Sequence, residues 1–267
     1  MKINLRMLKR RCLSDFNDFG RLGKVTVGSR GRRIFIDNGK NVLAIAHLDT
    51  VVHARHFVTC RLENRTTVFS EQLDDRLGAY ILLDHLPRLG LEYDILLTEG
   101  EEIGLSTAAD FVPPRQYNWA FSFDRMGTDV VLYQYDDADM RLLLAEFGLR
   151  TGIGSFSDIC SLNIGAKAFN FGCGYYHNHE PLSHMVAGDT RRMIDTFTCF
   201  YDRYAETQMP HTYTAYNPFD ELYAKYDYRS ADNLYSAEGC ECIYCGSIVS
   251  ADEYYFAGQE CAECYVE

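Results

Sequence analysis

The sequence has no long apolar run, and this absence excludes a membrane-spanning helix. No stretch of its 267 residues approaches the length of about 18 consecutive apolar residues that a spanning helix needs. The N-terminus, residues 1–18, is basic but has neither the apolar stretch nor the small-residue cleavage site of a signal peptide. We therefore expect a cytoplasmic protein with no membrane contact.

Positive charge is scarce beyond the first part of the chain. Residues 1–33 carry ten Lys and Arg against two Asp and Glu, a balance of +8, so the remaining residues carry −20 to give the chain total of −12. Such an acidic body argues against nucleic-acid binding. The basic segment could contact nucleic acid or a membrane surface, but pairing with the acidic body is the simpler interpretation.

Short apolar runs alternate with helical patterns over most of the chain, which predicts an α/β fold. Strands are expected at residues 24–27, 33–37, 41–48, 57–62, 66–69, 93–98, 119–123, 129–133 and 167–171. Helices are expected at residues 4–19, 75–89, 105–111, 140–147, 157–162 and 189–206. We expect one domain over residues 1–207, with a mixed, mostly parallel central sheet and helices on both faces. Residues 208–238 lose this periodicity and read as a linker.

Side chains that commonly bind metals follow four of the buried strands. They are His47 and Asp49, the glutamates Glu99, Glu101 and Glu102, Asp124, and the histidines of residues 177–179, while Asp74 and Asp75 open a predicted helix. Aspartates at a helix start can also be simple caps. The crowded glutamates would repel one another unless a cation binds them or some are exposed or protonated.

This number of His and carboxylate side chains suits a pair of zinc ions, with manganese or cobalt as substitutes. Two metals about 3.5–4 Å apart need a bridging carboxylate. The attacking water also needs a free carboxylate to accept its proton. Adjacent Glu101 and Glu102 suit this division of labour, one as base and one as ligand.

In this order, the motifs resemble those of the co-catalytic dinuclear zinc exopeptidases, which include leucyl-aminopeptidase-like enzymes, tetrahedral aminopeptidases and carboxypeptidase or tripeptidase relatives. The matching segments are His47-Leu48-Asp49, Asp74 through Gly78, Glu101 through Gly104, Asp124, and Gly174-Tyr175-Tyr176-His177-Asn178-His179. The resemblance covers residues 20–205. The spacings leave no room for the lid or inserted domain of the larger relatives, so a bare catalytic core closest to the leucyl-aminopeptidase-like branch is expected.

The resemblance also implies a role for each matching residue. His47 and Asp124 would hold one zinc, Glu102 and His179 the other, and Asp74 would bridge them. Asp75 would follow Asp74 through a cis peptide bond. Glu101 would be the general base, and Asp49 would orient the imidazole of His47. His177 and His184 are alternatives to His179 as the late ligand, and Asp158 has a supporting role near the substrate.

Five of the ten cysteines crowd the end of the chain. Cys242 and Cys245 form one Cys-x-x-Cys pair, and Cys261 and Cys264 form another fifteen residues later. This spacing predicts a zinc ribbon over residues 239–267 with one structural zinc, and Cys240 could replace a ligand. A disulfide-linked or disordered tail is the alternative. Because the segment is acidic, we expect a protein partner or a role near the cleft for it, rather than nucleic-acid binding.

Together these features predict a zinc-dependent amide hydrolase, foremost an aminopeptidase acting on short peptides. Another metal-dependent hydrolase, such as a deacylase of acylated amines or a carboxypeptidase, would need a pocket cation for the substrate carboxylate, with Arg125 and Arg76 as candidates. A non-catalytic binding protein that works through the ribbon is the third alternative. The presence of every expected ligand type and of the base argues against it.

Overall fold

The computed structural model describes residues 2–52, 56–62, 64–212, 240–241 and 248–249. Contacts divide the chain into two units, Met1–Tyr216 and Asn217–Glu267. Most of the predicted linker and nearly all of the predicted zinc ribbon lie outside the described residues. No helix in the described part of the chain is long and apolar enough to cross a membrane.

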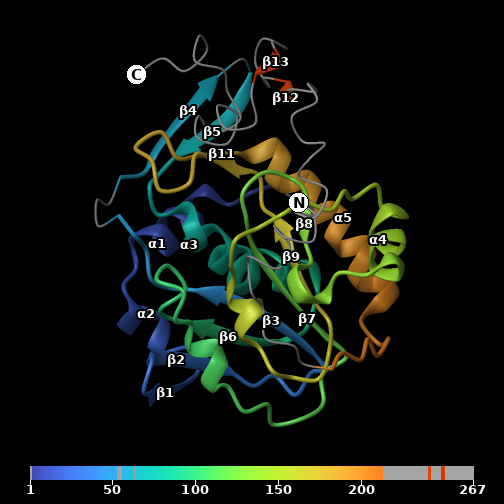
Figure 1. The fold of residues 1–267 in the computed structure, drawn as a ribbon. Coiled ribbons are helices and arrows are strands. Elements are labelled where there is room, and N and C mark those ends of the chain that lie inside the picture. Colours follow the sequence, from blue (N-terminus) through green and yellow to red (C-terminus); the bar gives the residue numbers. More distant parts are fainter. Residues whose placement is uncertain (1, 53–55, 63, 213–239, 242–247, 250–267) are drawn as a thin grey trace. The chain divides into compact units, whose positions relative to one another are not determined.

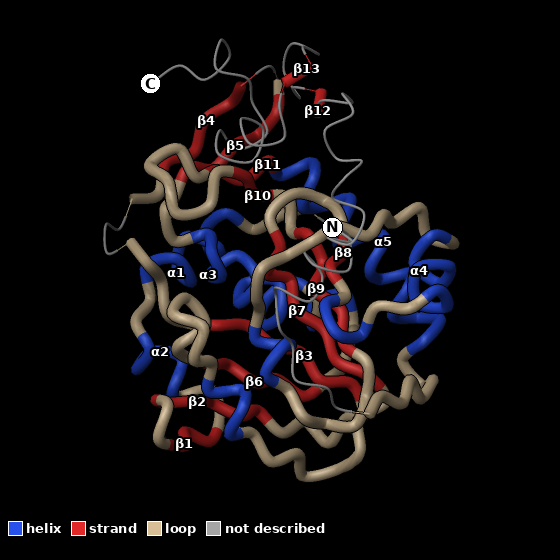
Figure 2. The backbone as a smooth tube through the Cα atoms, viewed as in Figure 1, coloured by secondary structure: helices blue, strands red, loops and turns tan. Residues whose placement is uncertain are grey.

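A seven-stranded mixed sheet forms the centre of the first unit, in the order β1-β2-β6-β3-β7-β9-β8 (Figures 1 and 2). Its strands are β1 (Lys24–Gly28), β2 (Gly31–Ile36), β3 (Val42–His47), β6 (Asp94–Thr98), β7 (Trp119–Arg125), β8 (Val130–Val131) and β9 (Ala168–Gly172). The four central strands β6, β3, β7 and β9 are parallel, whereas β1, β2 and β8 join antiparallel. The predicted fold class is confirmed, and all four parallel strands end at the same edge.

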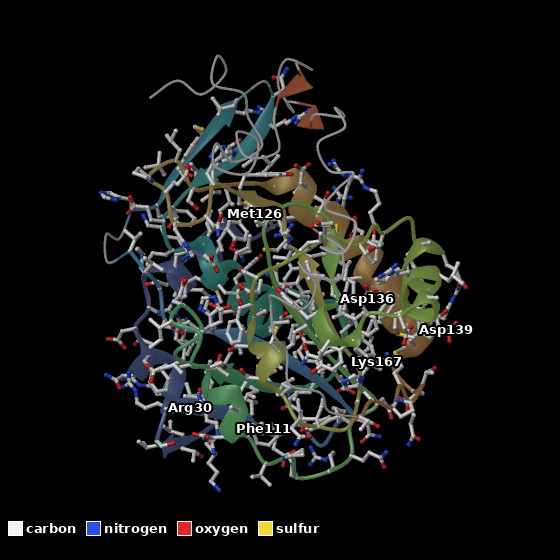
Figure 3. All side chains as sticks on the ribbon, in the orientation of Figure 1. Arg30, Phe111, Met126, Asp136, Asp139 and Lys167 are labelled. Carbon is white, nitrogen blue, oxygen red and sulfur yellow. The ribbon has the colours of Figure 1, made fainter. Side chains whose placement is uncertain are left out.

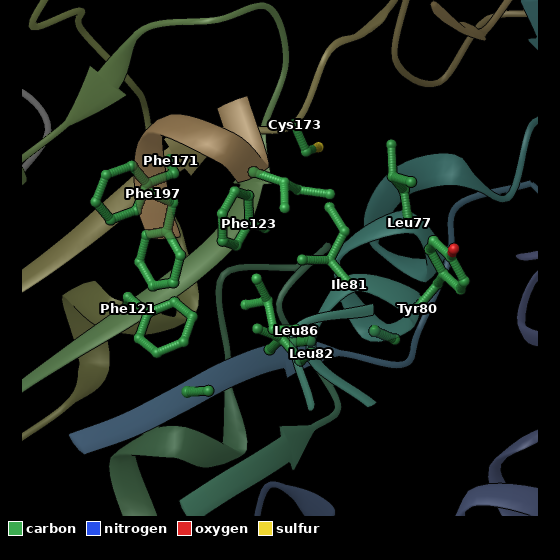
Figure 4. Packing of buried hydrophobic residues seen from close by; sticks show 14 of the residues in the cluster. Leu77, Tyr80, Ile81, Leu82, Leu86, Phe121, Phe123, Phe171, Cys173 and Phe197 are labelled. Atoms are coloured by element: carbon green, nitrogen blue, oxygen red, sulfur yellow. The ribbon is translucent and has the colours of Figure 1, made fainter. Parts of the chain in front are cut away.

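One face of this sheet packs against α-helices. They are α1 (Leu5–Leu13), α3 (Leu73–Tyr80) with the π-helix η1 (Ile81–His85), and α5 (Ala187–Tyr204), with α4 (Ala138–Ala145) packed beside α5. The rings of Phe121, Phe123 and Phe171 from the sheet surround Phe197 of α5, at centroid distances from 4.5 to 5.0 Å (Figure 4). Each fully buried ring of this kind stabilises the fold by about 1.5–3 kcal/mol.

The opposite face is covered by single 3-10 turns and loops rather than by α-helices. The turns are η3 (Thr107–Asp110), η4 (Tyr133–Tyr135) and η5 (Asp158–Ser161). They pack on the side chains that the sheet directs to this second face, such as Leu43, Ile45 and Leu96. Helices were expected at 105–111 and 157–162, and both segments do contain helical turns, of the 3-10 type. Each ends after about one turn, because extended residues follow directly at Phe111 and Leu162.

The N-terminal helix predicted over residues 4–19 is interrupted. Ser14 and Asp15 adopt extended backbone, and Asp15 then caps a second helix, α2 (Phe16–Gly20), by accepting from the N–H groups of Asn17 and Asp18. The expected helix at 75–89 is likewise divided into α3, η1 and the 3-10 turn η2 (Pro87–Leu89).

Helix α1 is fastened to α3 and η1. Arg11 forms a buried ion pair with Asp84 of η1, with 2.6 Å between Nε and Oδ2. The backbone N–H of Asn4 donates to the hydroxyl of Tyr80 at 2.8 Å. The Arg11–Asp84 pair and the Arg32–Glu99 pair, at 2.6 Å, show two arginines of the basic segment pairing with the acidic body.

A second, antiparallel sheet has the order β10-β11-β5-β4. Its strands are β4 (Val58–Leu62), β5 (Arg65–Phe69), β10 (Tyr175–Tyr176) and β11 (His184–Val186). The predicted hairpin of β4 and β5 is confirmed, with Asn64 in the left-handed region at φ 64° in its turn. Strands β12 (Cys240–Glu241) and β13 (Ile248–Val249) pair with each other.

Figure 3 shows the side chains of the fold, in which Phe111 is buried while Arg30 and Asp139 are exposed.

Candidate metal centre

The carboxyl ends of the four parallel strands bring the predicted site residues together. His47 ends β3, Glu101 and Glu102 follow β6, Asp124 lies near the end of β7, and the 173–179 segment follows β9. Ligands of open α/β sheets bind at this edge.

Three of these residues form a buried group that we call the inner triad: His47, Asp74 and Asp124. The Nε2 atom of His47 lies 3.2 Å from Oδ1 of Asp74 and 3.4 Å from Oδ1 of Asp124. All three ligand atoms lie within 4.8 Å of one another. One imidazole nitrogen and two carboxylate oxygens therefore converge on a single point that could hold a cation.

A second group, the outer triad, consists of Asp74, Glu102 and His179. The Nε2 atom of His179 lies 3.0 Å from Oδ2 of Asp74 and 3.0 Å from Oε2 of Glu102. Asp74 thus offers one oxygen to each triad, the arrangement that a bridging carboxylate needs. The peptide bond between Asp74 and Asp75 is cis, as the resemblance implied.

Asp49 contacts residues of both triads. Its backbone carbonyl lies 3.0 Å from Nδ1 of His47, whereas its carboxylate is farther away at 3.6 Å. Oδ2 of the same side chain accepts the backbone N–H of Glu102 at 3.1 Å. Asp49 was expected to orient His47, and the structure also connects it to the turn that carries Glu102.

Glu101 lies beside the inner triad and is not a member of either group. Its Oε2 is 3.9 Å from Nε2 of His47, and its side chain is mostly buried. Glu99 of the same turn accepts from Arg32 through both carboxylate oxygens and so is directed away from the triads.

Two residues that hold Asp124 were not foreseen from the sequence. Ser157 donates its hydroxyl to Oδ2 of Asp124 at 2.8 Å. The amide oxygen of Asn170 accepts the backbone N–H of Asp124 at 3.1 Å. The Ser157 hydroxyl occupies Oδ2, which leaves Oδ1 facing His47. The detectable signal was Asn170 itself, a polar residue in the middle of an apolar strand.

The electrostatics of the cluster show an excess of negative charge. Burial, with repulsion from Asp124, Asp158 and Asp74, raises the pKa of Glu101 to about 9. Burial and repulsion from Asp74 raise the pKa of Glu102 to about 7. Burial opposes the charged form of His47, but its hydrogen bonds with carboxylates hold its pKa well above the usual range. A bound cation would relieve this repulsion.

The residues present fit a pair of divalent ions. Each triad combines imidazole nitrogen with carboxylate oxygen, the ligand types that zinc and its substitutes accept. In addition, Oε1 of Glu102 is buried without a hydrogen-bond partner among the described residues. A buried carboxylate oxygen without a donor is costly, and a metal ion at the outer triad would remove that cost.

The other candidates lie apart from the triads. His177 pairs with Glu180 at 3.1 Å, and its ring stacks on that of His184. Asp158 is buried, accepts hydroxyl hydrogens from Thr98 and Ser106, and has its pKa raised to about 6 by burial. Cys242, Cys245, Cys261 and Cys264 lie outside the described residues.

A cavity of about 250 Å³ opens beside the two triads. Its wall includes Asp74, Glu101, Glu102, Asp124 and His179 together with Arg125, Met126, Tyr133, Phe156 and Asn178. This volume lies just below the usual range for ligand sites, about 300–1,000 Å³. The cavity can therefore admit a small substrate next to the converging carboxylates.

The fold is similar to that of several solved peptidases. A tripeptidase from Staphylococcus aureus aligns at a TM-score of 0.54 and 12% identity, covering 78% of this chain and 100% of that one. The Pyrococcus horikoshii TET1 peptidase, which can assemble into a tetrahedron or a large octahedral shell, aligns at 0.52 and 12% identity, covering 72% and 97%. An aminopeptidase from the archaeon Desulfurococcus kamchatkensis aligns at 0.52 and 12% identity, covering 76% and 95%.

These alignments show that the core has the fold of tetrahedral aminopeptidases and tripeptidases. No profile of a known family and no curated protein matches the chain.

Proposed function

We propose that the protein is a metal-dependent aminopeptidase that hydrolyses short peptides. The observation that carries the proposal is the pair of triads sharing Asp74, with Glu101 beside them and a small cavity in front. The peptidase fold supports it. Zinc is the preferred ion for both triads, with manganese or cobalt as substitutes. Cys242, Cys245, Cys261 and Cys264 stay proposed ligands of a separate structural zinc.

Ions bound at the triads would polarise the scissile carbonyl and lower the pKa of water. In this proposal Glu101 takes the proton of the attacking water and returns it to the leaving amine. Its pKa of about 9, set by burial and neighbouring carboxylates, shows a strong affinity for a proton. Cations at the adjacent triads would lower that pKa, so that Glu101 is ionised when substrate arrives.

The test is the substitution Glu101→Gln. We expect turnover of a leucyl dipeptide to fall by about 10³-fold or more, because the proton acceptor is lost, while metal content by mass spectrometry stays that of the unmodified protein. Glu102→Gln should instead lose metal. The exposed pair partner of Arg203, Glu146, offers a matched control, and Glu146→Gln should change neither quantity.

Metal loss in Glu101→Gln with retention in Glu102→Gln would mean that the two roles are exchanged. Full activity in Glu101→Gln would overturn the mechanism.

A further inference from the structure

A positively charged side chain stands in the wall of the cavity. Arg125 follows Asp124 at the end of β7, and no other Lys or Arg lines the cavity within the part of the chain that the structure describes. Arg76, the other arginine considered from the sequence, is not part of this wall. It is buried, donates to the backbone carbonyl of Leu48 and lies over the ring of Phe19. Of these two arginines, Arg125 is the one placed to meet a substrate.

The guanidinium of Arg125 is held in a fixed orientation. Nε donates to Oδ1 of Asp129 at 3.1 Å, and Nη2 donates to Oδ2 of Asp129 at 3.2 Å. The Arg125 side chain is one quarter exposed. Its third nitrogen, Nη1, donates to no described group. Asp129 therefore orients the guanidinium and leaves donors on one side of it.

The loop that contains Gly152 and Gly154 packs closely against this wall of the cavity. A Cβ atom on Gly152 would lie 1.8 Å from Oδ2 of Asp129 and 3.5 Å from Nη2 of Arg125. A Cβ atom on Gly154 would lie 2.7 Å from the hydroxyl of Tyr133, which itself donates to the carbonyl of Phe156 at 3.0 Å. Gly152 allows the loop to approach the Arg125–Asp129 pair, and Gly154 allows it to approach Tyr133, so this wall of the cavity is tightly packed.

We propose that Arg125 binds a carboxylate of the substrate, and that the preferred substrates are di- or tripeptides whose free C-terminal carboxylate reaches this wall. The proposal rests on the proposed peptidase function. A guanidinium already oriented by one carboxylate loses little conformational entropy when it binds a second, and such charge-assisted hydrogen bonds are among the strongest in proteins. The metal-facing carboxylates repel an anion, which favours binding of the carboxylate end of the peptide at Arg125.

The experiment compares matched substrates on the metal-loaded full chain. One pair is leucyl-glycine and its C-terminal amide, which differ only in the terminal charge. The second is glutamyl-glycine amide and glutaminyl-glycine amide, which move the carboxylate to the first side chain. For the unmodified protein we expect kcat/KM to be about 10–100-fold higher for leucyl-glycine than for its amide, the range expected of a hydrogen bond to a charged group. We expect no such preference in the second pair.

The variant Arg125→Met should bring the first ratio close to one, and Arg125→Lys should keep part of it. If Arg125→Met does not fold, Arg125→Gln, which keeps a donor toward Asp129 without the charge, should give the same loss. Arg203→Met is the matched control, because Arg203 is an exposed arginine paired with Glu146, and it should leave the ratio unchanged.

The outcomes separate this proposal from the one on which it rests. Hydrolysis with the same leucyl ratio in the unmodified protein and Arg125→Met overturns the role of Arg125 alone. The unmodified protein could instead prefer glutamyl-glycine amide over glutaminyl-glycine amide, with Arg125→Met removing that preference alone. This result would overturn recognition of the C-terminal carboxylate and would assign the bound carboxylate to a substrate side chain. No hydrolysis of any peptide by the unmodified, metal-loaded protein overturns both proposals.

Discussion

The two triads share Asp74 but differ in their surroundings. In the inner triad, His47 is 1% exposed and ends a central strand, and Asp124 is held by Ser157 and Asn170. In the outer triad, the His179 side chain is 42% exposed and its residue has a φ of 64° in a loop. Ligands on rigid, buried elements are more preorganised than ligands on exposed loops. We therefore expect the inner triad to retain its ion longer than the outer one.

The largest loss of metal and of activity is expected from replacing Asp74, because both triads share this residue. Asp74→Ala should release both ions and lower kcat/KM by about 10³-fold or more, because polarisation of the carbonyl and activation of water are lost together. Metal content and peptide hydrolysis measured on the same sample check this. Asp84→Asn, in the same helical segment but facing Arg11, is a control for general destabilisation. Retention of one ion in Asp74→Ala would show that the triads do not depend on a bridge.

A direct comparison comes from replacing one histidine at a time. His47→Ala should lower the total metal affinity more than His179→Ala, because it removes a buried nitrogen ligand that the fold holds in place. In His179→Ala one ion should remain bound after dialysis against a mild chelator. In His47→Ala we expect less than one. His177→Ala, two residues from His179 but paired with Glu180, should retain both ions. Equal losses in the two triad variants would mean that burial does not set retention.

The smallest effect concerns pH. Because burial and repulsion from Asp74 raise the pKa of Glu102 to about 7, a proton occupies this ligand below pH 7 in the metal-free protein. A metal must displace that proton, so affinity at the outer triad falls by up to about tenfold for each pH unit below 7. Above pH 7 the proton is already absent, and this contribution vanishes. Metal titrations between pH 8 and pH 6 measure it, and a flat profile would contradict the assignment of Glu102.

The residues of the site were more predictable than the way they are held. The candidate ligands His47, Glu102 and Asp124 each follow an apolar run, and parallel strands must end at a common edge, so their convergence follows from pattern and topology. The contact from Asp49 to the N–H of Glu102 joins two segments 53 residues apart. Nothing local in the sequence signals such a contact, because it depends on how two turns pack.

The fold, too, was predictable in some parts and not in others. Most strands of the central sheet were located well because their apolar runs are short and continuous, as at Val42–His47. The strand expected at residues 129–133 is only Val130–Val131, and the short strands β10 and β11 were not predicted. The covering of the second face was less predictable, since a pattern such as that of residues 157–162 does not distinguish one 3-10 turn from a short α-helix. The break at Ser14 and Asp15 also escaped the periodicity of residues 4–19, because the apolar spacing continues across it and only the capping side chain of Asp15 marks the new start.

The fastening of helix α1 has a practical consequence for anyone who shortens the chain. Arg11 is the counter-charge of buried Asp84, and Asn4 binds the hydroxyl of Tyr80 at the end of α3. The first turn of α3 carries Asp74. Removal of residues 2–13 would leave Asp84 buried without its cation, which is costly, and would uncover the helix that carries the shared ligand. Expression boundaries and affinity tags at this end are therefore expected to affect the candidate metal centre.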